Sequence, residues 1–297
     1  MPVDSSENPQ SALNRAPVSP APVAIGGVGG SGTRLIASIL ASSGFDIGSD
    51  RNPASDNLAF TLLFKQSDLW PLDKNRARID ELIRLFLHTM FYRQDLTKRD
   101  KQLIRALAEQ PRLNAPVEWL RQRAEALISL PGDAQTPAHW GWKEPNTHIF
   151  LPALNEHIPK LKYIHVTRHG LDMAYSANQA QVRFWGEALT GRATASVSPQ
   201  ASFDYWCAAH RRVMDIGSSM GSRFLLLNFD RFCAQPGQGM AGLLHFLGIE
   251  PSLEQNQCLL DMVRRPGSVG RHKSEPRLRL HEQDLALLRQ LGFEGPD

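Results

Sequence analysis

The sequence predicts an α/β protein in which a mostly parallel central sheet is flanked by helices. Three short β-compatible runs, at 22–28, 162–168 and 223–229, are each followed by a segment with helical spacing. Strands that alternate with helices form parallel sheets, because each connection crosses a face of the sheet on its return. A glycine-rich loop also joins the first strand to the first helix, in a P-loop-like arrangement.

The individual elements follow from where each pattern begins and ends. Apolar residues after the glycine loop recur at helical spacing until Gly44. We expect later helices over 172–180, over 240–247 before Gly248, and near 282–291. The stretch 264–276 is basic and rich in Gly and Pro, which predicts a loop.

The chain is expected to consist of a tail and one domain. Residues 1–21 are rich in Pro, Ser, Ala and Asn, which predicts a flexible N-terminal tail. Residues 22–297 are long enough to form a single α/β domain with one large core. Apolar residues keep helical spacing from about 73 to 130, which we interpret as a helical insertion in that domain.

Charge and cysteine content restrict the class of function. The 33 basic and 30 acidic residues give a net charge of +3 without a long basic run, which favours a pocket for one anionic ligand over nucleic-acid binding. Cys207, Cys233 and Cys258 form no C-x-x-C pair, so we expect neither a disulfide framework nor a zinc site, and a reducing, cytoplasmic location. No segment approaches about 18 uncharged apolar residues, so no membrane span is expected.

The glycine loop is the main functional motif. The stretch AIGGVGGSGTRLIASIL, residues 24–40, contains five glycines in seven positions, followed by the start of a helix. Backbone N–H groups and the helix dipole at such a loop attract a phosphate, and the hydroxyls of Ser31 and Thr33 add donors. A tight turn that serves packing alone is the alternative.

Two known phosphate loops fit this stretch only in part. The nucleoside-triphosphate P-loop requires Lys after its last glycine, whereas Thr33 follows Gly32 here. The dinucleotide fingerprint can be placed on Gly27, Gly29 and Gly32, but no convincing second strand carries the acidic residue that should follow about 20 residues later.

Four segments together resemble sulfotransferases that use 3′-phosphoadenosine 5′-phosphosulfate (PAPS), in particular bacterial, tyrosylprotein and glycan-type members. GGVGGSGTRLIASIL is similar to the 5′-phosphosulfate loop of that family, and GWKEP is similar to its Trp-x-x-Lys-x-Pro segment. YIHVTRHGLDMAYS resembles the 3′-phosphate motif, in which Arg168 and Ser176 take the positions of the ligands. FLLLNFDRFCAQ resembles a later strand and helix of the family.

The resemblance implies PAPS as donor, PAP as product and no metal. It assigns the 5′-phosphosulfate to Gly29, Gly30, Ser31, Gly32, Thr33 and Arg34, and the 3′-phosphate to Arg168 and Ser176. Arg168, at the end of a strand, offers a bidentate fork to a phosphate, and Ser176 could donate a second hydrogen bond. The loop RRPGSVGRHK resembles the segment that folds over the 3′-phosphate, with Arg265, Gly267, Gly270, Arg271 and Lys273 as candidates. Pro266 departs from the family pattern, and a solvated charge run is the alternative.

The catalytic cation is the main departure from the family. Most relatives carry Lys or Arg immediately before Ser-Gly-Thr, whereas this chain has Gly30. Arg34 and Lys143 are the candidates to replace it, and we favour Lys143 slightly. A structural ion pair or an exposed position is the alternative for each.

A general base is also needed to take the proton of the acceptor. Glu144 and His148 rank first because they lie close to Lys143 in sequence, and His139 belongs to the same cluster. Asp50 or Asp56, shortly after the first helix, could serve equally.

The function expected from these observations is transfer of a sulfuryl group to a hydroxyl or amine of a small-molecule, glycan or peptide acceptor. A P-loop kinase-like phosphotransferase and a non-catalytic PAP- or nucleotide-binding protein are the alternatives. Acceptor specificity should lie in the helical insertion, which resembles no segment that identifies the acceptor.

Overall fold

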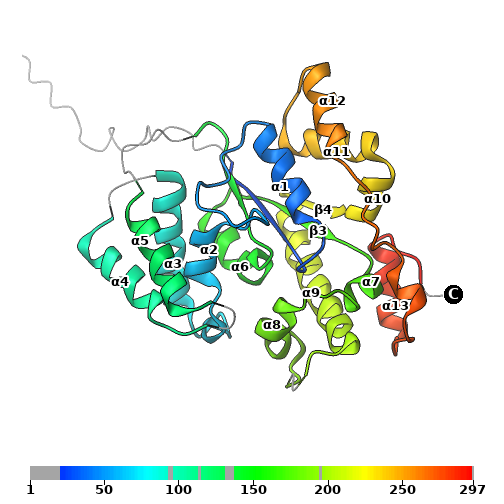
Figure 1. Cartoon of the computed structure of the whole chain (residues 1–297), viewed down its shortest axis with the longest axis horizontal. Helices are drawn as coiled ribbons and strands as arrows, with labels where there is room; N and C mark the ends of the chain where they lie inside the picture. Colours follow the sequence, from blue (N-terminus) through cyan, green and yellow to red (C-terminus); the bar gives the residue numbers. More distant parts are fainter. Residues whose placement is uncertain (1–20, 93–95, 113–114, 131–136, 194–195, 296–297) are drawn as a thin grey trace, which may run out of the picture.

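A four-stranded, fully parallel sheet forms the centre of the protein (Figure 1). The computed structural model describes residues 21–92, 96–112, 115–130, 137–193 and 196–295. The strands lie in the order β2-β1-β3-β4, with bounds β1 Val23–Gly27, β2 Gly141–Lys143, β3 Lys162–Thr167 and β4 Phe224–Asn228. The three predicted strands and the α/β class are therefore confirmed, and all four carboxyl ends meet at one edge of the sheet.

The fourth strand, β2, was missed in the sequence analysis. It has only three residues, which is too short for a periodic pattern to be seen. Its pairing with β1 places Gly141 opposite Val23. A Cβ at Gly141 would lie 2.1 Å from the Val23 carbonyl oxygen, so this close approach requires glycine.

Helices cover both faces of the sheet. Their bounds are α1 Thr33–Ser42, α2 Leu58–Phe64, α3 Arg76–Leu87, α4 Lys98–Ala108, α5 Val117–Ile128, α6 Thr147–His157, α7 Gly170–Ala174, α8 Ala180–Thr190, α9 Pro199–Met220, α10 Phe229–Ala234, α11 Pro236–Leu247, α12 Leu253–Asp261 and α13 Glu282–Gln290. Short 3₁₀ segments lie at 67–69, 221–223 and 271–274, and a π segment at 88–92. Within the described ranges, no helix has the length and apolar character needed to cross a membrane.

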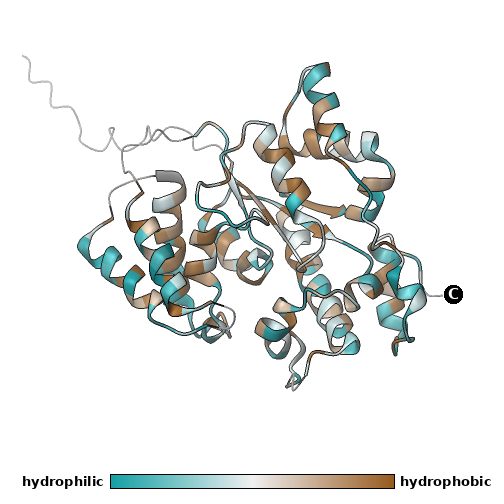
Figure 2. Ribbon diagram, in the orientation of Figure 1, coloured by the Kyte–Doolittle hydropathy of each residue, from teal (hydrophilic) through white to brown (hydrophobic). Residues whose placement is uncertain are grey.

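Alternating side chains of the strands build two separate cores. Ala24 and Tyr163 point into a large core shared with α2, α3, α6 and α9, whereas Ile25 and Ile164 point into a smaller core under α1, α11 and α12. Figure 2 shows the same division, with hydrophobic colour along the inner turns and hydrophilic colour on the outer turns of α4 and α12. The two cores fix the sheet in place, and the loops that form the site extend from the ends of its strands.

The helix predicted over 172–180 ends earlier than expected, because α7 stops at Ala174 and the next helix, α8, begins only at Ala180. The side-chain amide of Gln179 donates to the carbonyls of Met173, Ala174 and Ser176 at 3.0, 3.2 and 2.8 Å. These bonds satisfy the free carbonyls at the end of α7, so the chain can turn before α8 begins. The predicted helices near 240–247 and 282–291 are present, although α11 starts earlier, with Pro236 in its first turn.

Three buried histidines lie together beneath the sheet. His148 on α6, His165 on β3 and His210 on α9 are each at most 1% exposed. The ring of His165 lies 5.9 Å from that of His148 and 5.0 Å from that of His210. Burial lowers the pKa of His148 to about 3 and that of His210 to about 4, and lowers the pKa of His165 as well.

This cluster predicts that the protein loses stability in mild acid. An unfolded histidine takes up a proton near pH 6.5, whereas these folded rings stay neutral until the pH is much lower, so stability is lost as the pH falls below about 6.5. We expect the free energy of unfolding to fall by about 1 kcal/mol per pH unit for each ring between pH 6 and pH 4. Urea unfolding at a series of pH values measures this slope. His210→Phe should make the slope shallower, and His245→Phe, at an exposed position on α11, is the control; equal slopes in wild type and His210→Phe would contradict the prediction.

Candidate functional site

The glycine loop lies between β1 and α1, at the carboxyl edge of the sheet. Gly30 and Gly32 have φ angles of 92° and 99°, a region that favours glycine. Gly32 precedes the first residue of α1, and a Cβ there would lie 2.4 Å from the ring of Phe229. Ser31 is 1% exposed, and its hydroxyl has no hydrogen-bond partner among the described residues. The loop therefore directs backbone N–H groups and an unused hydroxyl to the same place.

Gln181 holds this loop in position from α8. Its side-chain oxygen accepts a hydrogen bond from the Gly29 N–H at 3.1 Å, and its amide nitrogen donates to the Gly27 carbonyl at 3.1 Å. Gln181 is buried. The sequence analysis missed this residue, because it lies more than 150 positions away from the loop and in no motif.

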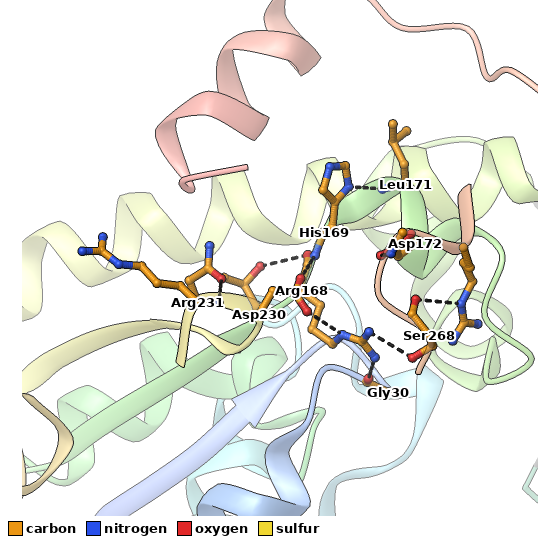
Figure 3. Close-up of polar contacts among 12 residues, drawn as sticks. Gly30, Arg168, His169, Leu171, Asp172, Asp230, Arg231 and Ser268 are labelled. Carbon is orange, nitrogen blue, oxygen red and sulfur yellow. Dashed lines mark hydrogen bonds and ion pairs between the residues drawn. The ribbon is translucent and has the colours of Figure 1, made fainter. Parts of the chain in front are cut away.

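Arg168 lies directly after β3 and connects three other segments (Figure 3). Its Nε is 3.3 Å from Asp230 Oδ1, and its two terminal nitrogens donate to Ser268 Oγ at 3.0 Å and to the Gly30 carbonyl at 3.5 Å. Asp230 Oδ2 also accepts a hydrogen bond from the N–H of His169 at 3.0 Å. The guanidinium is thus held at the glycine loop by a carboxylate on α10.

Ser176 lies beside the same glycine loop. A Cβ built on Gly30 would be 3.5 Å from Ser176 Oγ and 3.5 Å from the methyl group of Met173. Because Gly30 also has a positive φ, a longer side chain at this position would be strained. The structure therefore brings the two predicted phosphate motifs together, and the positive φ gives a physical reason for glycine at position 30.

The C-terminal loop is attached to α7 through Asp172. This carboxylate accepts hydrogen bonds from the N–H groups of Gly270 at 2.7 Å and His272 at 3.1 Å, and its Oδ1 lies 2.6 Å from His272 Nδ1. Burial acts to raise the pKa of Asp172, but the hydrogen bonds outweigh it and the pKa is lowered. Arg271 donates to the carbonyls of Tyr175 at 3.2 Å and Ser268 at 3.4 Å. The loop is therefore fixed beside Arg168.

Within that loop, the residues nearest the site differ from those predicted. Arg265, Gly267 and Lys273 are exposed, and they are not among the described residues that line the adjoining pocket. Arg264 and Pro266 line it instead. Ser268, which contacts Arg168, was not predicted because a serine between two glycine positions carries no signal of its own.

These segments enclose a pocket of about 600 Å³, which we call the donor pocket. It is lined by Gly30, Gly32, Thr33, Arg34, Leu35, Ala54, Asp56, Lys143, Pro145, Arg168, Asn178, Phe229, Met262, Arg264 and Pro266. Its volume falls in the range of small-molecule sites, and four of its lining residues are cationic. The pocket can therefore hold a multiply charged anion.

Both candidate cations line the donor pocket. Lys143, the last residue of β2, has only 3% of its side chain exposed. Its ammonium forms an ion pair with Asp56 and donates to the Ala54 carbonyl at 3.0 Å. Arg34, in the first turn of α1, is exposed. Lys143 is therefore the cation whose position is fixed by its surroundings.

Glu144 adjoins this ion pair. It is 2% exposed, and its carboxylate accepts hydrogen bonds from the backbone N–H and side-chain amide of Asn146 at 2.5 and 2.8 Å. Burial, together with the nearby charge of Asp56, raises the pKa of Glu144 to about 7. Glu144 and Asp56 both line a second pocket of about 170 Å³, which we call the inner pocket. Asp56 lines both pockets and marks where they meet.

The other predicted bases lie elsewhere. His148 is completely buried, belongs to the histidine cluster described above, and lines neither pocket. Asp50 forms an ion pair with Arg123 at 2.6 Å. His139 precedes β2, at the opposite edge of the sheet from the glycine loop, and its ring lies 5.2 Å from Phe45. We therefore leave these three out of the candidate machinery.

No group of three or more His, Cys, Asp or Glu side chains in the described part of the chain is arranged to hold a metal ion.

Comparisons with known proteins agree on a family. A model of the sulfotransferase family matches residues 22–253. The sulfotransferase domain of the olefin synthase from Synechococcus PCC 7002 is 15% identical, with a TM-score of 0.50, and the match covers 94% of this chain and 97% of that domain. The sulfotransferase domain from the curacin biosynthetic pathway is also 15% identical, with a TM-score of 0.52 and coverage of 93% and 99%.

At this low identity the two solved structures show a shared fold rather than a shared substrate. No curated protein sequence matches the chain. The family model nevertheless spans most of the chain, and it includes the glycine loop, Lys143 and Arg168. The chain therefore belongs to the sulfotransferase family.

Proposed function

We propose that this protein transfers the sulfuryl group of PAPS to a hydroxyl or amine of a small-molecule, glycan or peptide acceptor. The observation that carries the proposal is the meeting of the glycine loop, Arg168 and Lys143 in one donor pocket. PAPS has a 5′-phosphosulfate and a 3′-phosphate, so its site needs two anion-binding regions. The family match favours this reaction over the kinase-like phosphotransferase.

The donor would be held at both of its charged ends. The backbone N–H groups of Gly30, Gly32 and Thr33, at the N-terminus of α1, would bind the 5′-phosphosulfate, assisted by the free hydroxyl of Ser31. The N–H groups of Gly29 and Ser31 already donate to Gln181 and Val28. Arg168 and Ser176 would bind the 3′-phosphate. Arg168 is held by Asp230 but still lines the pocket, so its guanidinium can accept a second anion.

Two buried charged residues, Lys143 and Glu144, would serve the transfer step. The acceptor oxygen or nitrogen forms a bond to sulfur while the bond between sulfur and the bridging oxygen breaks, and PAP leaves with that electron pair. Lys143 would stabilise the negative charge on the departing phosphate, because it is a cation already fixed at the pocket. Arg34 is the alternative cation.

Glu144 would take the proton of the acceptor. It lines the inner pocket together with Asp56, and the charges of Asp56 and Lys143 both act on its carboxylate. A base with a pKa near the working pH is both available and strong enough to accept a proton.

We also propose a reducing, cytoplasmic location. The three cysteines are unpaired: Cys207 and Cys233 are buried, and Cys258 is exposed.

The assignment of Arg168 predicts a loss of PAP binding. In Arg168→Ala, PAP should bind about 100-fold more weakly, because charge-assisted hydrogen bonds to a phosphate contribute about 3 kcal/mol. Isothermal titration with PAP, ATP and NAD measures both the loss and the selectivity. Arg231→Ala removes a nearby exposed arginine on α10 and is the matched control (Figure 3). Tight ATP binding without PAP binding, or a PAP affinity equal in Arg168→Ala and wild type, would refute the donor assignment.

The roles of Lys143 and Arg34 can be separated by their effects on turnover. Lys143→Met should lower kcat about 100-fold and change PAP affinity much less, since the charge is needed mainly in the transition state. Arg34→Met should have the smaller effect on kcat. The measurement is the rate of PAP release from PAPS with 4-nitrophenol as acceptor, together with circular dichroism to confirm folding. A larger kcat loss in Arg34→Met would reverse the assignment.

The pKa of Glu144 predicts the pH dependence of the reaction. Only the deprotonated carboxylate accepts a proton, so kcat should rise as the pH increases through about 7 and then level off. Glu144→Gln should lower kcat about 100-fold and abolish this rise. The test is a pH profile of PAP release from pH 5.5 to 9 for both proteins. If the rise in kcat near pH 7 persists in Glu144→Gln, the rise belongs to the titration of another group.

A further inference from the structure

A third pocket shares part of its wall with the inner pocket, and we call it the outer pocket. It has a volume of about 390 Å³ and is lined by Lys65, Gln66, Ser67, Asp68, Gln110, Pro111, Arg112, Arg183 and Phe184. Lys65, Arg112 and Phe184 line the inner pocket as well. The three pockets are therefore adjacent: Asp56 lines both the donor and inner pockets, and these three residues line both the inner and outer pockets.

The outer pocket carries an excess of positive charge. Lys65, Arg112 and Arg183 line it, and none of them forms an ion pair with a carboxylate among the described residues. The one carboxylate in its wall, Asp68, is 2.7 Å from Arg78 and is therefore already paired. Lys65 instead lies over the ring of Phe184, 4.9 Å from its centre. The charge of Asp68 also acts on Arg112, but this one carboxylate, already paired with Arg78, faces three cations in the wall.

Of the three cations, Arg112 has the largest free-energy cost of burial. Its terminal nitrogens donate to the carbonyls of Thr61 at 3.2 Å, Leu62 at 2.5 Å and Leu107 at 2.9 Å, so it bridges the ends of α2 and α4. Burial lowers its pKa to about 10. A buried cation bonded only to neutral carbonyls is stabilised when an anion approaches.

The inner and outer pockets combine three kinds of lining. The inner pocket has the carboxylates Asp56 and Glu144, and its apolar wall is made by Leu58, Trp119 and Leu120. The cations Lys65 and Arg112 line both pockets, and Arg183 lines the outer pocket only. A molecule that fits this lining has a group that gives up a proton, an apolar body, and an anion that reaches the outer pocket.

We propose that the acceptor is a hydroxy compound that carries a carboxylate or phosphate, which is bound in the outer pocket by Lys65, Arg112 and Arg183. The hydroxyl then points to Glu144 and the sulfuryl donor. This inference rests on the proposed sulfuryl transfer and adds the chemical class of the acceptor. The cations come from the C-terminal end of α2, from the segment after α4 and from α8, so the helical insertion and α8 together select the acceptor.

The test compares anionic probes with a neutral one of the same shape. The probes are 4-hydroxyphenylacetate, 4-hydroxybenzylphosphonate and the methyl ester of 4-hydroxyphenylacetate, titrated into the full chain with and without PAP. We expect both anions to bind at least about 10-fold more tightly than the ester, which corresponds to one charge-assisted hydrogen bond. Equal affinities of anions and ester, or no binding of either anion, would overturn the proposal.

Variants then place the binding in the outer pocket. Arg183 is exposed on α8 and, among the described residues, its side chain forms no hydrogen bond with Lys143, Glu144 or Arg168. Arg183→Gln and Arg183→Glu should therefore fold normally, whereas Arg112 variants would lose the bridge between α2 and α4. Arg183→Gln should remove most of the preference for the anions, Arg183→Glu should reverse it, and affinity for the ester should stay within about threefold. Arg289→Gln, at an exposed position on α13, is the control. Unchanged preference in both Arg183 variants would overturn the proposal.

The same titrations separate the proposed acceptor class from the proposed use of PAPS as donor. PAP binding together with a lack of preference for anions would refute only the acceptor class. A lack of PAP binding by the wild-type protein would refute the donor assignment. If the anion preference nevertheless depends on Arg183, the assignment of the outer pocket as an anion site is still supported.

Discussion

The interaction on which the site depends most is the one between Arg168 and Asp230. The carboxylate fixes a guanidinium at the end of β3, where it also reaches the Gly30 carbonyl and the Ser268 hydroxyl. Because Asp230 also accepts from the His169 N–H, it sets the direction in which the chain leaves the strand. One ion pair therefore links the glycine loop, α10 and the C-terminal loop, beside the bonds of Gln181 to the first loop and of Asp172 to the last.

A second ion pair, between Lys143 and Asp56, lies where the donor and inner pockets meet. A buried ammonium needs an opposite charge or hydrogen-bond acceptors close by, and Asp56 supplies the charge for Lys143. The same carboxylate helps to raise the pKa of Glu144. Asp56 thus pairs with a cation on one side and makes a base more basic on the other, and it lines both pockets itself.

The sequence allowed the locally encoded parts of the site to be predicted. The glycine loop, Arg168 and Ser176 each lie in a short motif at the end of a strand, and parallel strands bring such ends together. Gln181, Asp172 and Ser268 act through partners about 100 or more positions away, which no local pattern encodes. The prediction of His148 rested on its closeness to Lys143 in sequence. The start of α6 between them turns the imidazole into the core, so nearness along the chain did not become nearness in space.

Charge links the acceptor end of the site to its base. The ammonium of Lys65 acts to lower the pKa of Glu144, in opposition to burial and Asp56. An anion bound to Lys65 offsets that attraction, so the carboxylate becomes a stronger base when the outer pocket is filled. Lys65 also packs over Phe184, which lines both acceptor pockets. The arrangement therefore couples recognition of an anionic acceptor to the proton transfer that its hydroxyl requires, through residues of α2 and α8 that lie outside every motif of the donor site.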